Sequence, residues 1–93
     1  MKVSFLIINH IHAQSADAAA IRRGNEMYAR KSYDSALQAY SNIENNKNKY
    51  ISDFNSGNAL NKQEKYADAV KKYDEAIANS TDKVIQAQAL YNK

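Results

Sequence analysis

The stretch FNSGNALNKQ, residues 54–63, decides the fold because its central Gly57-Asn58 pair occurs twice in the chain. The other copy is Gly24-Asn25, which lies 33 residues earlier. The match continues at the same offset, with Tyr33, Ala36, Leu37 and Tyr40 in one copy and Tyr66, Ala69, Val70 and Tyr73 in the other. A fixed offset of this length indicates an internal structural repeat.

Both copies predict a pair of helices. The apolar residues after each Gly-Asn pair recur every three or four positions, which places them on one helix face. The segments before them, about 17–30 and 49–63, also predict helices, each with its glycine well inside. A glycine inside a helix costs about 1 kcal/mol relative to alanine, so it indicates close approach of a neighbouring helix. Polar clusters at 45–48 and 79–82 predict the joints between repeats, and the second offers cap residues for a further helix.

The composition favours helices and excludes several kinds of site. The 93 residues include no proline, two glycines and no cysteine, so disulfides, thiolate metal ligands and a cysteine nucleophile are excluded. The net charge of +3 comes from interspersed basic and acidic residues, which is typical of a solvated surface and not of a nucleic-acid site. Both histidines, His10 and His12, lie near the N-terminus, so the repeats contain no Ser/His/Asp set. We therefore expect no enzyme activity, no catalytic residue, no metal site and no cofactor.

The first 14 residues differ from the rest. Lys2 precedes the apolar run at 3–8, and Ala13 could end a cleavage site, as in a secretory signal peptide. A disordered leader is the alternative, because the apolar run barely reaches the roughly 7 residues of the shortest signal-peptide cores. A membrane span is excluded, because it needs about 20 apolar residues. We expect residues 1–14 to be a leader, 15–93 to be the repeat domain, and the protein to be exported to the periplasm or cell envelope, with a cytoplasmic location as the alternative.

The repeat resembles the tetratricopeptide repeat (TPR), a helix-turn-helix unit of about 34 residues. The resemblance covers about residues 17–93 and implies an all-α fold of antiparallel helix pairs stacked as an α-solenoid of about two and a half repeats. Its units are a first repeat at about 17–46, a second at about 47–80 and the start of a third at about 81–93. It implies that Gly24 packs against Ala36, and Gly57 against Ala69, where the helices cross.

The sequence departs from the family pattern at several positions. The large apolar residue expected four positions before each glycine is Ala20 in the first copy and Asp53 in the second. The glycine expected between the two helices is Lys31 in one copy and Glu64 in the other, and the inter-repeat proline is missing. These departures weaken the packing expected of single helices without changing the repeat. The Gln/Asn-rich composition and the residue pattern of the repeat also resemble those of envelope repeat proteins of Bacteroidetes-type bacteria, including those of aerotolerance operons.

The resemblance implies a non-catalytic module that binds a protein or peptide on a concave surface lined by the first helix of each pair. The residues expected to contact the partner are Arg22, Asn25, Tyr28, Phe54, Asn55, Asn58, Lys62, Tyr91 and Asn92. They combine aromatic anchors, cations and asparagines able to bond a peptide backbone. The alternative for Asn25 and Asn58 is hydrogen bonding within the module.

The end of the chain indicates a second function. Residues 90–93, LYNK, resemble residues 53–56, DFNS, so a third repeat begins there. Repeat arrays generally need about three units and a polar cap, so we expect a piece of a longer array with marginal stability or self-association through its last helix. The alternative function is therefore a structural subunit that assembles in the cell envelope.

Overall fold

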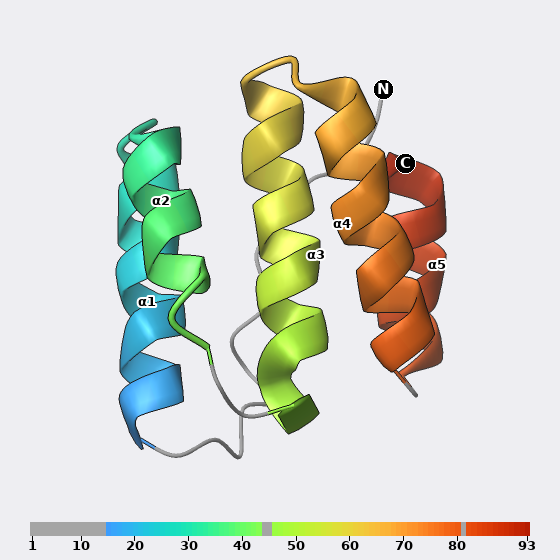
Figure 1. The fold of residues 1–93 in the computed structure, drawn as a ribbon, viewed down its shortest axis with the longest axis horizontal. Helices are drawn as coiled ribbons and strands as arrows, with labels where there is room; N and C mark the ends of the chain where they lie inside the picture. Colours follow the sequence, from blue (N-terminus) through green and yellow to red (C-terminus); the bar gives the residue numbers. More distant parts are fainter. Residues whose placement is uncertain (1–14, 44–45, 81) are drawn as a thin grey trace.

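The computed structural model describes residues 15–43, 46–80 and 82–93, which form five α-helices and no strand (Figure 1). The helices are α1 (Ser15–Ala29), α2 (Tyr33–Tyr40), α3 (Asn46–Lys62), α4 (Tyr66–Asn79) and α5 (Lys83–Asn92). The prediction of an all-α fold is confirmed. The predicted leader at 1–14 lies outside the described residues. Within the described part of the chain, no helix combines the length and the apolar character that crossing a membrane requires.

Neighbouring helices in the sequence are neighbours in space. Helix α1 packs on α2 and α3 packs on α4, while α3 also packs on α2 and α5 packs on α4 (Figure 1). Helix α3 is the centre of this arrangement, and all of its residues from 51 to 60 are buried. The apolar core gathers around it and consists of Ile21, Ile51, Phe54, Leu60, Ala69, Tyr73, Ala76, Ile85 and Ala89.

The two long helix pairs turn in the same way. The turn after α1 contains Lys31 at φ 63°, and the turn after α3 contains Glu64 at φ 62°, both in the left-handed region. The Ser32 amide donates to the carbonyl of Met27 at 2.8 Å, and the corresponding bond closes the end of α3. This is the Schellman arrangement, which favours glycine at the left-handed position because a Cβ is strained there. The two positions that lack the expected glycine therefore keep the backbone conformation that glycine would adopt.

Each glycine inside a first helix lies directly under a tyrosine ring. A Cβ added to Gly57 would lie 2.6 Å from Cε1 of Tyr73, and one added to Gly24 would lie even closer to the ring of Tyr40. The prediction of close helix approach at both glycines is confirmed. The nearest side chains are these tyrosine rings, whereas the resemblance implied alanines. The alanines, Ala36 and Ala69, are buried nearby in the second helices.

Three helix boundaries refine the expectations. Helix α3 already begins at Asn46, so most of the polar cluster at 45–48 forms a first helical turn and not a joint. Helix α2 ends at Tyr40, which leaves Ile43 beyond the helix. Asp82 caps α5 as predicted, because its Oδ1 accepts hydrogen bonds from the amides of Val84 at 2.9 Å and Ile85 at 3.4 Å.

Replacing Glu64 with glycine should stabilise the protein. Glycine removes the left-handed strain at this turn, and the gain in the free energy of unfolding should be about 0.5 to 1 kcal/mol after the entropy of the unfolded chain is counted. Urea denaturation followed by circular dichroism measures this change in the free energy of unfolding. The matched control is Glu64→Ala, which removes the same charge but keeps a Cβ and should give no gain. Equal gains from both variants would show that the charge, and not the backbone, is responsible.

Candidate functional site

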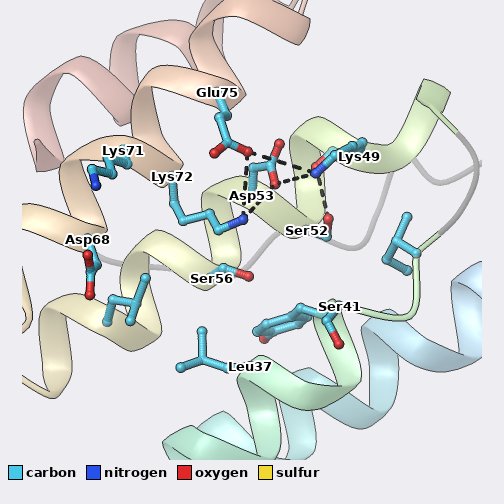
Figure 2. Close-up of a pocket in the computed structure, with 13 residues that line it drawn as sticks. Leu37, Ser41, Lys49, Ser52, Asp53, Ser56, Asp68, Lys71, Lys72 and Glu75 are labelled. Carbon is cyan, nitrogen blue, oxygen red and sulfur yellow. Dashed lines mark hydrogen bonds and ion pairs between the residues drawn. The ribbon is translucent and has the colours of Figure 1, made fainter.

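A pocket of about 390 Å³ lies where helices α2, α3 and α4 meet (Figure 2). Helix α3 contributes Lys49, Ser52, Asp53, Ser56 and Leu60, and helix α4 contributes Asp68, Lys71, Lys72 and Glu75. Each set recurs every three or four residues, so it forms one face of its helix. The remaining wall comes from α2 and the turn after it, with Leu37, Tyr40, Ser41 and Ile43. The pocket therefore has a charged side and a mainly apolar side.

Four charged side chains on the α3 and α4 side form a closed ring of alternating sign (Figure 2). The Lys49 ammonium donates to Oδ1 of Asp53 at 3.1 Å and lies 3.9 Å from Oε2 of Glu75. The Lys72 ammonium lies 3.8 Å from the same oxygen of Asp53 and 3.6 Å from Oε2 of Glu75. Each carboxylate thus faces both lysines, and the ring is neutral as a whole.

Asp53 is the buried member of this ring. Its side chain is 3% exposed, while those of its three partners are 37% to 45% exposed. Burial raises the pKa of this carboxyl above its ordinary value, and the hydrogen bond from Lys49 opposes the rise. Its second oxygen, Oδ2, is buried and accepts no hydrogen bond. A buried carboxylate that is only half satisfied costs free energy, so its presence in a pocket makes this the candidate site.

The pocket is suited to binding a ligand with a polar head and an apolar body. Its volume lies in the range of about 300 to 1,000 Å³ that is usual for ligand pockets. The side chains of Leu37, Ile43 and Leu60 add apolar surface to the lining beside the charged ring. Among the residues that the structure describes, no three His, Cys, Asp or Glu side chains lie together in a way that could hold a metal ion.

The residues predicted from the sequence lie elsewhere. None of the nine lines the pocket beside Asp53. Arg22 on α1, Lys62 on α3 and Tyr91 on α5 are exposed, while Asn25 and Tyr28 are half-buried. The Tyr28 ring also meets that of Tyr33 edge to face, with ring centroids 5.5 Å apart.

The other four predicted residues are buried. Phe54, Asn55, Asn58 and Asn92 are all 0% exposed. The Phe54 ring packs against the ring of Tyr73, with centroids 6.0 Å apart. A partner would have to displace contacts within the chain to reach these side chains. Their assignment to partner binding stays a prediction.

The structure brings the four asparagines together in two pairs. The Asn55 amide donates to Oδ1 of Asn25 at 3.3 Å, and the Asn92 amide donates to Oδ1 of Asn58 at 3.1 Å. Each bond joins one first helix to the next first helix along the chain. The alternative of hydrogen bonding within the module is therefore confirmed for Asn25 and Asn58.

A tyrosine hydroxyl completes each asparagine pair. Tyr40 donates to Oδ1 of Asn25, and Tyr73 donates to Oδ1 of Asn58, both at 2.6 Å. Burial raises the pKa of both hydroxyls, so they stay protonated donors at physiological pH. The same three-residue network thus occurs in both copies and links helix pairs to one another.

The sequence contained one signal of the pocket that was not used for function. Asp53 stands where the repeat expects a large apolar residue, and Lys49 lies four residues before it, at the spacing of a helical ion pair. The other half of the ring comes from α4, about 20 positions later, and no local spacing predicts that contact. Comparison with protein-family models, curated proteins and solved structures gives no match to this chain.

The raised pKa of Asp53 predicts an unusual dependence of stability on pH. Because folding raises this pKa, the carboxyl favours the folded state when it is protonated and disfavours it as the pH rises through the folded value. An Asp53→Asn variant should be at least as stable as wild type at neutral pH. The stability of the wild type should increase relative to that of the variant as the pH falls through the folded pKa towards the ordinary value of 3.8.

Urea denaturation of both proteins across this pH range checks the sign. The matched control is Glu26→Gln, which removes an exposed carboxylate of α1 that does not line the pocket. A wild-type advantage that grows with rising pH would show that the lysines outweigh burial and would contradict the prediction.

Proposed function

We propose that this protein is a non-catalytic interaction module of the tetratricopeptide-repeat kind, which binds a protein or peptide partner and works in the cell envelope after export. Three repeated features support this architecture, namely the left-handed turn, the glycine under a tyrosine ring and the asparagine-tyrosine network. Their occurrence in both copies is expected of stacked, equivalent helix pairs.

The observation that carries the proposal is the gathering of exposed apolar side chains on α5. Four large apolar residues are exposed in the described part of the chain, and three of them belong to this helix, namely Val84 at 65%, Leu90 at 59% and Tyr91 at 55%. An exposed apolar patch on a small protein commonly marks a site of interaction. Tyr91 is also one of the residues that the sequence assigned to partner binding.

A charge-reversal experiment tests the partner surface without disturbing the core. Arg22 and Lys62 are exposed cations on α1 and α3, and both belong to the predicted surface. An Arg22→Glu, Lys62→Glu variant should keep its fold. It should capture much less of a partner from envelope or cytosolic extracts than wild type does, because reversing charges at the rim of an interface lowers affinity.

The control carries the same change of charge at exposed positions outside the predicted set. Arg23→Glu, Lys65→Glu is such a variant, since both side chains are exposed. It should capture the partner as wild type does. Equal capture by all three proteins, or equal loss in both variants, would remove the predicted surface as the binding site.

The alternative function, assembly through the last helix, is favoured by the arrangement of the apolar residues on α5. Val84, Ala87 and Tyr91 follow one another at spacings of three and four, with Leu90 beside them, and all four are exposed. The charged residues of this region are Asp82 and Lys83 at the start of the helix and Lys93 after its end. Two copies could therefore pack these faces together without strong repulsion.

Sedimentation velocity over a range of concentrations tests the assembly. The wild type should sediment faster as its concentration rises, and Leu90→Glu should keep it monomeric, because a charge is costly in an apolar interface. Tyr66→Glu is the matched control, because Tyr66 is 57% exposed on α4. A wild type that stays monomeric throughout, or a control that behaves like Leu90→Glu, would contradict assembly through α5.

A further inference from the structure

We propose that the pocket between α2, α3 and α4 is a receptor for an arginine side chain of the partner, and that Lys72 occupies the place of its guanidinium until the partner binds. Asp53 and Glu75 are the carboxylates that would receive it. This inference names the partner chemistry of the interaction module and rests on that proposed function. It concerns a different surface from the exposed cations and from the apolar face of α5.

Lys72 is the replaceable member of the charged ring. Its ammonium lies 3.8 Å from Asp53 and 3.6 Å from Glu75, and both distances exceed those of ordinary hydrogen bonds, which are about 2.7 to 3.2 Å. Its side chain is 37% exposed and that of Lys49 is 44% exposed, so burial holds neither lysine in place and the hydrogen-bond geometry separates them. Lys49 is held more firmly, because it donates a hydrogen bond to Asp53 at 3.1 Å. A cation of better geometry could therefore displace Lys72 and leave Lys49 in place.

A guanidinium fits this place better than an ammonium. Both ring lysines lie near Oδ1 of Asp53, whereas its buried Oδ2 accepts no hydrogen bond. A guanidinium presents several N–H donors in one plane and can bond both oxygens of a carboxylate, while an ammonium acts as a point charge. The unsatisfied oxygen thus selects arginine over lysine.

The opposite wall suits the stem of an arginine. Leu37, Ile43 and Leu60 line the same pocket as the charged ring. The methylene groups of a bound arginine would bury against this apolar surface while its head reaches the carboxylates. The pocket thus offers matching environments for both parts of one side chain.

The charge balance also favours a cation once Lys72 has moved out. The lining then keeps three carboxylates, Asp53, Asp68 and Glu75, against two ammonium groups, Lys49 and Lys71, which leaves a charge of −1. The repeat itself does not require a carboxylate here, because Ala20 and Leu90 stand at the positions corresponding to Asp53. A buried charge that the fold does not need is better explained by a ligand.

Titration with N-acetyl-arginine amide, followed by amide chemical shifts of the full chain, tests the proposal. Shifts should appear at α3 and α4 around the pocket, and N-acetyl-lysine amide should bind more weakly. Lys72→Met should tighten binding of the arginine probe about threefold, because it removes the competing cation. Lys71→Met is the matched control, because it removes the same charge from the pocket wall and no ion pair joins Lys71 to Asp53 or Glu75. It should tighten binding of the arginine probe less than Lys72→Met does.

Asp53→Asn should abolish binding of the probe, and Glu75→Gln, at an exposed position, should weaken it with less risk to folding. Equal tightening in Lys72→Met and Lys71→Met would show general electrostatic attraction and overturn the proposal. Unchanged binding in a folded Asp53→Asn or Glu75→Gln variant would overturn it as well.

The proposal of an interaction module is tested separately by capture of a protein partner. If Arg22→Glu, Lys62→Glu loses a captured protein and Asp53→Asn keeps it, the arginine pocket is contradicted and the interaction module is supported. Binding of the arginine probe without capture of any protein would support the pocket and contradict the interaction module.

Discussion

The contact of a tyrosine ring with a glycine backbone is the constraint on which the helix pairing depends. At Gly57 the ring of Tyr73 lies so close that a Cβ would overlap it, and Gly24 and Tyr40 make the same contact. Only the missing side chain lets the second helix approach to this distance. The approach also places the tyrosine hydroxyl beside the asparagine that follows the glycine, where it finds its acceptor. One small residue thus fixes both the spacing of two helices and the partner of a buried polar group.

The central position of α3 explains why this helix is polar in sequence and buried in structure. A buried amide costs free energy unless it is hydrogen-bonded, so asparagines are tolerated in the core only where partners are supplied. Asn55 reaches back to the first helix pair, and Asn58 receives the amide of Asn92 from α5. Each bond replaces apolar packing with a directional contact, which makes the register between successive helices specific. The repeated asparagine-tyrosine network therefore supplements the small apolar core in holding the helices together.

The second helix pair carries a feature that the first lacks. Asp53 occupies a position where its counterparts are Ala20 and Leu90, and it is buried among charges that neutralise one another. Such a ring contributes little to stability, because the cost of burying the carboxylate offsets the attraction of the lysines. Its three partly exposed members, Lys49, Lys72 and Glu75, can rearrange without disturbing the core. The second helix pair thus contains a charged group that the pairing of the helices does not require.

The sequence by itself determined the helices, the repeat and the places of closest helix contact, because these follow from spacing along one chain. The Gly-Asn pairs predicted the close approach, and the polar cluster at 79–82 predicted a cap for the helix that follows, which Asp82 provides. It did not decide the exposure of the predicted surface residues: Arg22 is exposed and Asn55 is buried, although the 33-residue offset places them at the same position of the two copies. Nor did it show the pocket, because three separate helices bring its charged and apolar walls together. Burial and charge pairing between distant segments depend on how the helices pack in three dimensions, and only the tertiary structure decides them.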